Sequence, residues 1–142
     1  MANALYTLFK KALLDSSSAS TTFSLDTSNI RAVLTDHGTD TPVVATDDFL
    51  DDISTGTVET NDAAFTTTTT TGGAFDADDL TGATKFTTVS GATCESLNIY
   101  IDSGAAATSW LVLYIDTATG LPLTPNGGDV TVTCGTNIFS LS

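Results

Sequence analysis

Residues 96–115, SLNIYIDSGAAATSWLVLYI, decide the fold of this chain. In the first part of the stretch, apolar and more polar side chains alternate, which is the period of a β-strand. One face would carry Leu97, Ile99 and Ile101, and the other Ser96, Asn98 and Tyr100. In the last part, Trp110–Ile115 is apolar on both faces, as in a central strand buried between two layers. The stretch therefore predicts two strands of a layered β protein.

Short segments of the same kind occur along the rest of the chain, separated by turns rich in Gly, Asp and Asn. The further strands that we predict are residues 22–25, 30–35, 66–71, 83–89, 130–134 and 137–141. Residues 66–71 are six threonines, which suit a pleated surface, and Phe65 and Phe75 flank them as core anchors. Gly72 and Gly73 then supply a turn. Residues 47–53 predict one helical turn that faces Phe49, Leu50 and Ile53 inward.

The composition agrees with a β protein. Hydrophobic residues make up 41% of the 142 and charged residues only 15%, so threonine and serine supply much of the polar surface. Both favour strands and turns over helix interiors. We expect a mainly-β chain in which residues 16–142 form a single domain, a β-sandwich or a barrel-like, jelly-roll-like fold.

The N-terminal segment has a different period. Residues 4–14 place Leu5, Leu8, Phe9 and Leu13 on one stripe, as in an amphipathic helix. Lys10 and Lys11 lie toward its C-terminal end, where they complement the helix dipole, and Asn3 is the expected N-cap. We expect residues 1–15 to be a helical anchor that orders when it docks, because so short a helix is marginal alone in water.

The charge is strongly negative, with 17 acidic and 4 basic residues and a formal net charge of -13. Such a surface repels nucleic acid and anionic lipid, so we expect neither as a partner. Residues 1–15 place their apolar side chains ahead of Lys10 and Lys11, the reverse of a signal peptide, and Trp110–Ile115 is too short to span a bilayer. We expect a soluble product of the host cytoplasm.

Nothing in the sequence predicts catalysis. His37 lies in a Gly, Thr and Asp loop with no nucleophile motif near it, and we interpret it as a solvated side chain. The acidic pairs of residues 47–52 and 76–79 lack EF-hand spacing and a sugar cleft, so a solvated surface is favoured over Ca²⁺ binding or glycoside hydrolysis. Cys94 and Cys134 are expected to be half-buried thiols, with a cross-strand disulfide as the alternative. We expect no catalytic, cofactor or metal site.

Several segments resemble a family of small proteins that are encoded among the virion genes of tailed phages and prophages. The similar segments are MANALY at 1–6, GAFDADD at 73–79, IYIDSG at 99–104, YIDTATGLP at 114–122 and TPNGGDV at 124–130. They cover about half of the chain, and the last two are the most specific because their turn residues occur in one order. Residues 16–45 and the threonine run depart from the pattern, so contacts of those parts are not carried over.

The resemblance implies a non-enzymatic structural component of the virion, with the major capsid protein or other virion proteins as partners. Together with the acidic surface, it leads us to expect an outer capsid decoration or cement protein, assembled as a homo-oligomer, with a trimer favoured. A tail, neck or fibre-attachment component and a host-surface binding module stay open as alternatives. The expected interface residues are Leu5, Leu8, Phe9, Lys10, Lys11, Leu13, Trp110 and Tyr114.

Overall fold

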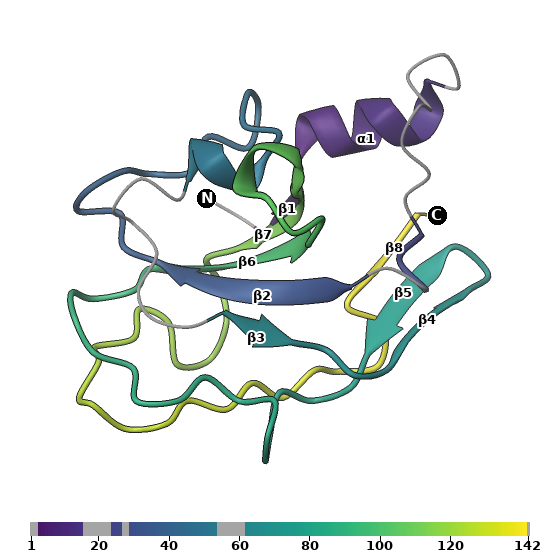
Figure 1. Cartoon of the computed structure of the whole chain (residues 1–142). Coiled ribbons are helices and arrows are strands. Elements are labelled where there is room, and N and C mark those ends of the chain that lie inside the picture. Colours follow the sequence, from purple (N-terminus) through teal and green to yellow (C-terminus); the bar gives the residue numbers. More distant parts are fainter. Residues whose placement is uncertain (1–2, 16–23, 27–28, 54–61, 142) are drawn as a thin grey trace.

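The chain folds as two antiparallel β-sheets that pack in a sandwich-like arrangement, with one α-helix near the N-terminus (Figure 1). The computed structural model describes residues 3–15, 24–26, 29–53 and 62–141, and eight strands lie in these ranges. The mainly-β, sandwich-like prediction is confirmed. The barrel-like alternative is wrong, because the two sheets do not close on each other.

The larger sheet has five strands and contains the stretch that decides the fold. In spatial order they are β1 (Ala4–Leu5), β7 (Trp110–Ile115), β6 (Ser96–Ile101), β2 (Ile30–Thr35) and β3 (Ala63–Ala64). The predicted strands at 30–35, 96–101 and 110–115 are therefore confirmed. The central strand is β6, which pairs along its whole length with β2 and β7.

Both faces of this sheet are covered. All six residues of β6 are buried, although polar and apolar side chains alternate along it. Leu97 and Ile99 point with Leu34 toward the second layer, where they line a shared cavity. Asn98 points to the opposite face, where the Tyr6 hydroxyl reaches it. The alternation thus separates an apolar face from a polar one, and the polar face is also buried.

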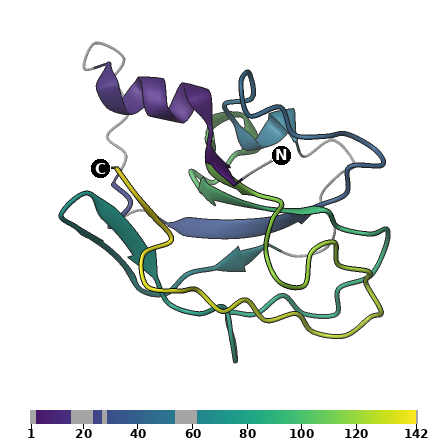
Figure 2. The ribbon, with the colours of Figure 1, turned by 180° about the vertical axis from the view of Figure 1, so that it is seen from behind.

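The second layer combines a small sheet with a ribbon of extended chain. The small sheet has the order β4 (Thr68–Thr71), β5 (Ala74–Ala77) and β8 (Phe139–Ser140). Two long segments, one on either side of β6 and β7 in sequence, run beside each other below the larger sheet (Figures 1 and 2). Isolated bridges join them at Leu80↔Val132, Phe86↔Val130 and Cys94↔Leu123. The strands predicted at 83–89 and 130–134 are thus wrong as regular strands, because single bridges replace a continuous ladder.

The threonine run forms a strand, as predicted, over Thr68–Thr71. Gly72 and Gly73 both have positive φ, +61° and +82°, which is the backbone of a two-residue type I′ hairpin turn. Phe65 and Phe75 are buried on either side, so their role as core anchors is confirmed. The predicted strand at 137–141 is confirmed as β8. The strand predicted at 22–25 lies partly outside the described residues, and Leu25 is in a turn.

Two short 3-10 helices, η1 (Leu50–Asp52) and η2 (Ala106–Thr108), close one end of the larger sheet. The helical turn predicted near residue 50 is η1, and Ile53 after it is buried as expected. Backbone N–H groups of Leu50 and Leu111 donate to the carbonyls of Ser109 and Asp48. These bonds cover the part of the β7 edge that β1 leaves open.

The N-terminal helix begins three residues later than predicted. Helix α1 spans Thr7–Leu14, and Ala4 and Leu5 belong to β1, where they pair with Tyr114 and Leu113. Asn3 is not the N-cap: its side-chain oxygen accepts hydrogen bonds from the backbone N–H groups of Asp116 and Thr117. Pairing with β7 therefore decides the conformation of Ala4 and Leu5, although the helical period of the sequence includes both residues.

The first fifteen residues are not a detached anchor. The side chains of Tyr6 and Phe9 are 0% exposed and belong to the same core as the β-sheets. Figures 1 and 2 show α1 lying above the larger sheet, on the side opposite to the ribbon. The predicted boundary at residue 15 is corrected accordingly, because β1 and the inner face of α1 complete the domain.

Candidate functional site

The outer side of α1 presents the most exposed large apolar side chain among the described residues, that of Leu14. Leu13 is 40% and Leu14 88% exposed, and Lys10 and Lys11 are exposed on the same helix. The helix itself is held from below by Phe9, which is fully buried. We call the four exposed residues, Lys10, Lys11, Leu13 and Leu14, the α1 surface. It combines an apolar and a basic character on a chain that is otherwise acidic.

The predicted interface residues divide into two groups. Lys10, Lys11 and Leu13 lie on the α1 surface, and Leu8 is half-buried beside them. Leu5 is half-buried in β1, and Phe9 is buried in the core, so neither forms part of that surface. Leu14, the most exposed, was missed, because the helical period places it off the apolar stripe.

Trp110 and Tyr114 make contacts within the chain. Trp110 packs against Phe49, with 4.7 Å between ring centroids. Tyr114 is 1% exposed and stacks on the imidazole of His37, with the ring centroids 6.1 Å apart. Their prediction as interface residues is corrected for Tyr114, because a buried side chain has no surface to offer a partner.

A network of polar side chains crosses the buried face of the larger sheet below α1. The Tyr6 hydroxyl donates to Asn98 Oδ1 at 2.7 Å, and Asn98 Nδ2 donates to Thr35 Oγ1 at 3.1 Å. The hydroxyls of Thr35 and Ser96 lie 2.5 Å apart. Burial raises the pKa of Tyr6, so the hydroxyl stays a neutral donor. These bonds satisfy side chains that burial would otherwise penalise.

His37 belongs to this network. The interpretation of His37 as a solvated loop residue is therefore wrong. Its Nε2 lies 2.9 Å from Ser96 Oγ, and its backbone N–H donates to the Glu95 carboxylate at 2.8 Å. In many enzymes, a histidine beside a serine hydroxyl acts as the general base that activates the serine as a nucleophile. Ser96 is fully buried, however, and its hydroxyl also meets Thr35 and Asn98. The arrangement therefore ties the loop at His37 to β6, and leaves no open position for a substrate.

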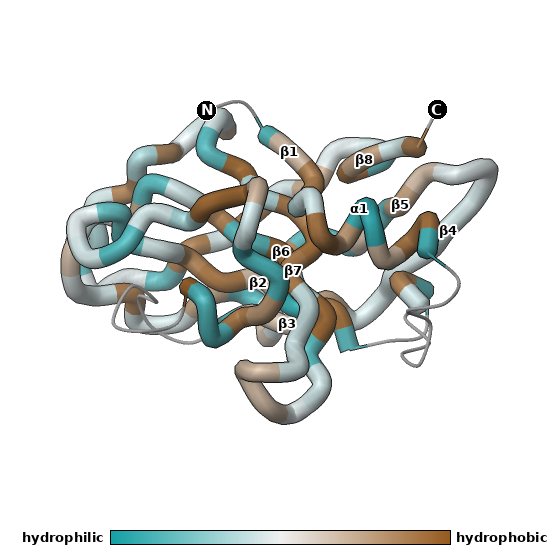
Figure 3. The backbone as a smooth tube through the Cα atoms, turned by 90° about the horizontal axis from the view of Figure 1, so that it is seen from above, coloured by the Kyte–Doolittle hydropathy of each residue, from teal (hydrophilic) through white to brown (hydrophobic). Residues whose placement is uncertain are grey.

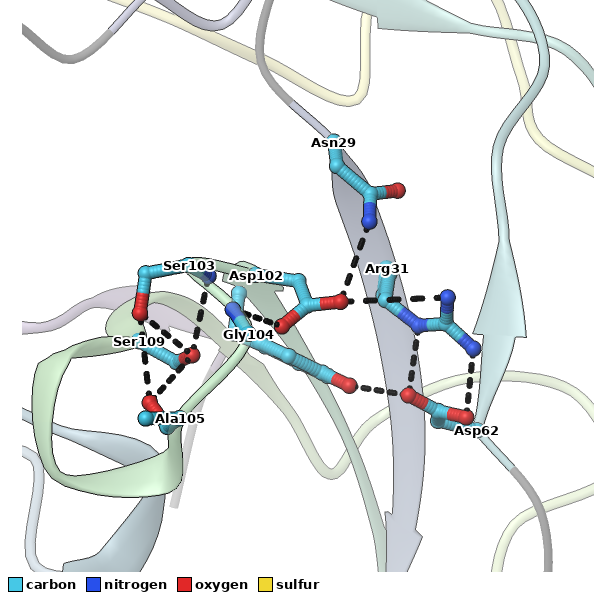
Figure 4. Close-up of polar contacts among 9 residues, drawn as sticks. Asn29, Arg31, Asp62, Asp102, Ser103, Gly104, Ala105 and Ser109 are labelled. Carbon is cyan, nitrogen blue, oxygen red and sulfur yellow. Dashed lines mark hydrogen bonds and ion pairs between the residues drawn. The ribbon is translucent and has the colours of Figure 1, made fainter.

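Arg31, on β2, gathers two carboxylates at the edge of the same sheet (Figure 4). Its Nε and Nη2 donate to the two oxygens of Asp62 at 2.5 and 2.6 Å, and its Nη1 lies 3.8 Å from Asp102 Oδ2. The Tyr100 hydroxyl also donates to Asp62, and Asn29 donates to Asp102. Burial alone would raise the pKa of Asp62, but the bonds from Arg31 and Tyr100 outweigh it and lower that pKa. This is a structural ion-pair cluster that joins β2, β6 and the approach to β3.

Many of the acidic side chains fasten turns, which the prediction of a simply solvated acidic surface did not include. The Asp78 carboxylate accepts from the backbone N–H groups of Thr66 and Thr67, and Asp79 accepts from that of Cys134. Asp52 accepts from the N–H groups of Asp48 and Phe49. In the part of the chain that the structure describes, no group of three or more His, Cys, Asp and Glu side chains is arranged to hold a metal ion.

A cavity of about 830 Å³ lies between the larger sheet and the C-terminal segment. Its floor includes Leu34 and Ile99, which are nonetheless only 2% and 1% exposed. These two side chains are therefore closely packed beneath the space. Cys134 also lines it, and burial, reinforced by Asp79, Asp78 and Asp76, raises the pKa of this thiol to about 11. Cys94 and Cys134 do not form a disulfide with each other, as expected.

Comparison with known proteins adds no relative. No protein-family model matches the chain, and a search of curated proteins finds no match either. Among the helices of the described residues, none combines the length and the apolar character that crossing a bilayer requires.

Proposed function

We propose that this chain is a non-enzymatic structural component of a tailed-phage particle, and more specifically an outer capsid decoration protein. The resemblance of about half of the sequence to small virion proteins supports the setting. The observation that carries the docking role is the α1 surface: Leu13 and Leu14 are exposed beside two lysines, on a helix that Phe9 holds in the core. A helix fixed in this way is ready to bind without first being ordered.

The partner surface follows from the chemistry of α1. Leu13 and Leu14 suit an apolar groove on a partner, and Lys10 and Lys11 favour a groove with carboxylates at its rim. The major capsid protein or another virion protein would offer that groove. The chain as a whole, with a net charge of -13, suits the outside of a shell and not the DNA-filled interior.

The polar clusters support a structural role over a catalytic one. The Ser96 hydroxyl is buried next to His37, and Arg31 is saturated by Asp62. These groups hold strands and loops in place and do not converge on an open cleft. Assembly into homo-oligomers is part of the proposal, with a trimer as the favoured form.

The test is rebinding of purified protein to particles that lack it. We expect Leu13→Ser/Leu14→Ser and Lys10→Glu/Lys11→Glu to weaken binding at least about tenfold, because both groups lie in the contact. Val43→Ser is the control, since Val43 is another exposed apolar residue, 49% accessible, outside α1.

Wild-type binding by both α1 variants, or absence of the protein from mature particles, would overturn the proposal. The copy number per particle separates the alternatives. Hundreds of copies indicate the shell, whereas a few to a few dozen indicate the tail, the neck or a fibre attachment. Binding of the free protein to host cells would favour the host-surface module instead.

A further inference from the structure

Strand β4 is an open edge of the smaller sheet. The sheet has the order β4-β5-β8, so β4 has a strand on one side only, and Thr69, Thr70 and Thr71 are exposed. Figure 1 shows the β4–β5 hairpin at the margin of the molecule, and in Figure 3 β4 and the turn after it have the pale colour of residues that are neither strongly hydrophilic nor strongly hydrophobic. Natural edge strands are usually protected by charges, prolines or bulges. Thr68–Thr71 has none of these.

The register of the hairpin shows which backbone groups of β4 point outward. Thr67 lies opposite Asp78, whose N–H donates to the Thr67 carbonyl. Bonded and non-bonded pairs alternate in an antiparallel ladder, so Thr69 and Thr71 also bond to β5. Thr68 and Thr70 therefore direct their N–H and C=O groups away from β5. Among the described residues, no backbone group pairs with them.

We propose that β4 pairs with β4 of a second copy of this chain, antiparallel and across a two-fold axis, so that the small sheets of the two copies become continuous. A register with Thr68 opposite Thr70 of the partner uses the outward groups of both strands, in about four backbone hydrogen bonds. The axis then passes through Thr69. Because every side chain at the seam is threonine, the edge is complementary to itself, and Thr–Thr pairs across strands are favourable.

Charge also favours a second copy at this position. Most of the acidic chain repels a copy of itself, whereas the run from 66 to 71 is uncharged. On the exposed face of the hairpin, Asp76 lies opposite Thr69 on β5. Three strand spacings would separate it from its symmetry mate, about 14 Å. This exceeds the Debye length of about 8 Å at physiological ionic strength, so the repulsion across the seam is largely screened.

The contact is small and is suited to copies that are already held side by side. Four residues a side bury far less than the roughly 1,000 Å² expected of a stable interface. Neighbouring copies on a shell, at effective concentrations in the millimolar range, would nonetheless populate it. The inference rests on the proposed function for this setting alone. Two-fold seams would join trimers laterally and give a continuous outer layer.

Disulfide trapping tests the pairing, in a Cys134→Ser background that removes the half-buried native thiol. Thr69→Cys places the two sulfurs at a non-bonded pair, with the Cα atoms about 4.5 Å apart, within disulfide range. Thr71→Cys, on the same face, would lie about 14 Å from its mate. At about 1 mM protein, mild oxidation should give at least fivefold more covalent dimer with Thr69→Cys than with Thr71→Cys or the exposed loop variant Thr87→Cys.

A second change addresses the backbone alone. In the Thr69→Cys protein, Thr70→Pro removes an outward N–H and keeps the bonds of Thr69 and Thr71 to β5, so covalent dimer should fall to the level of the loop control. Equal yields from positions 69, 71 and 87, or an unchanged yield with Thr70→Pro in a protein with wild-type circular dichroism, would overturn the pairing. Cross-linking by a protein that is absent from particles would retain the pairing and reject the proposed function.

Discussion

Asn98 is a polar and fully buried side chain at the middle of the central strand. Its amide accepts from Tyr6 and donates to Thr35 and Ser96, so its replacement affects three buried hydroxyls. A buried hydroxyl without a partner costs about 1–3 kcal/mol, whereas removing both partners together costs much less.

Asn98→Leu should therefore lower the free energy of unfolding by about 2–3 kcal/mol, and Tyr6→Phe by about 1 kcal/mol. In the double variant, the loss in the free energy of unfolding should be smaller than the sum of the two single losses. Phenylalanine at position 6 has no hydroxyl, so the loss of the Asn98 acceptor leaves no donor unpaired there. Urea unfolding of the four proteins gives the coupling energy. Strict additivity would show that the Tyr6–Asn98 bond contributes little.

Asp62 should make the stability depend on pH in the acid range. Its pKa in the folded protein is lowered, because the bonds from Arg31 and Tyr100 outweigh the opposing effect of burial. A carboxyl of this kind stabilises the fold above its unfolded pKa, near 3.9, and the contribution is lost as the pH falls through the lower folded pKa.

Asp62→Asn should thus be less stable than wild type at pH 7, and the difference should narrow as the pH falls below about 4. Unfolding midpoints in urea over that pH range provide the measurement, and a constant difference down to about pH 2.5 would contradict the role of the carboxylate.

At the scale of single residues, the sequence predicted which side chains are buried better than it predicted their hydrogen-bond partners. Ile99 and Leu111 are buried as their segments indicate. His37 was interpreted as solvated because its partners Glu95 and Ser96 lie almost sixty residues away in the chain. Hydrogen bonds between distant side chains leave no local period, and only the pairing of β2 with β6 brings these groups together.

Helix α1 has an inner and an outer side with opposite expected responses to mutation. Phe9→Ala removes a fully buried ring and should cost about 3–5 kcal/mol, whereas Leu14→Ser, at an exposed position, should stay within about 0.5 kcal/mol of wild type. Chemical denaturation of the two variants checks this. Similar values for both would mean that α1 does not belong to the core. For the same reason, deletion of residues 1–15 should prevent cooperative folding.

The β4–β5 turn offers a second test at the scale of an element. Gly72→Ala and Gly73→Ala both place a side chain at positive φ, which costs about 1–2 kcal/mol. At Gly73 the new Cβ would also lie 3.0 Å from the Leu141 carbonyl oxygen, whereas at Gly72 it would meet nothing within 4 Å. Gly73→Ala should therefore have the lower thermal midpoint, and the reverse order would contradict the contact with the segment after β8.

Elements with a strong local period were predictable, and those that depend on pairing were not. The strands at 30–35 and 96–101 follow from their alternation. The start of α1 was misplaced because Ala4 and Leu5 fit a helix as well as a strand, and only the edge of β7 decides between them. The segment around Phe86 alternates weakly and forms a single isolated bridge, with Val130.

The whole molecule carries 17 acidic and 4 basic residues, and this imbalance should make the fold sensitive to salt. Self-repulsion within a compact acidic protein is screened as ionic strength rises, from a Debye length of about 30 Å at 0.01 M to about 3 Å at 1 M. The thermal midpoint should rise over this range. NaCl and KCl should act equally, and a flat response would mean that the carboxylates bonded to backbone N–H groups already offset the repulsion.

The sandwich-like architecture was predictable from composition and spacing, because threonine-rich short strands with frequent turns have few other ways to bury their apolar faces. The layer formed by 80–94 and 123–132 was not, since these segments are largely irregular and are placed by three bridges and by the apolar face of the larger sheet.

The pairing of β1 with β7 has a consequence for biosynthesis. Ala4 leaves the ribosome about 110 residues before Tyr114, the residue beside which it finally lies. Until then the rings of Tyr6 and Phe9 have nowhere to bury, so a nascent polypeptide exposes them through most of its elongation. Contacts this distant in the chain also slow folding. Tyr6 and Phe9 are thus translated long before they settle, and a stalled or prematurely terminated product offers those rings to chaperones and proteases.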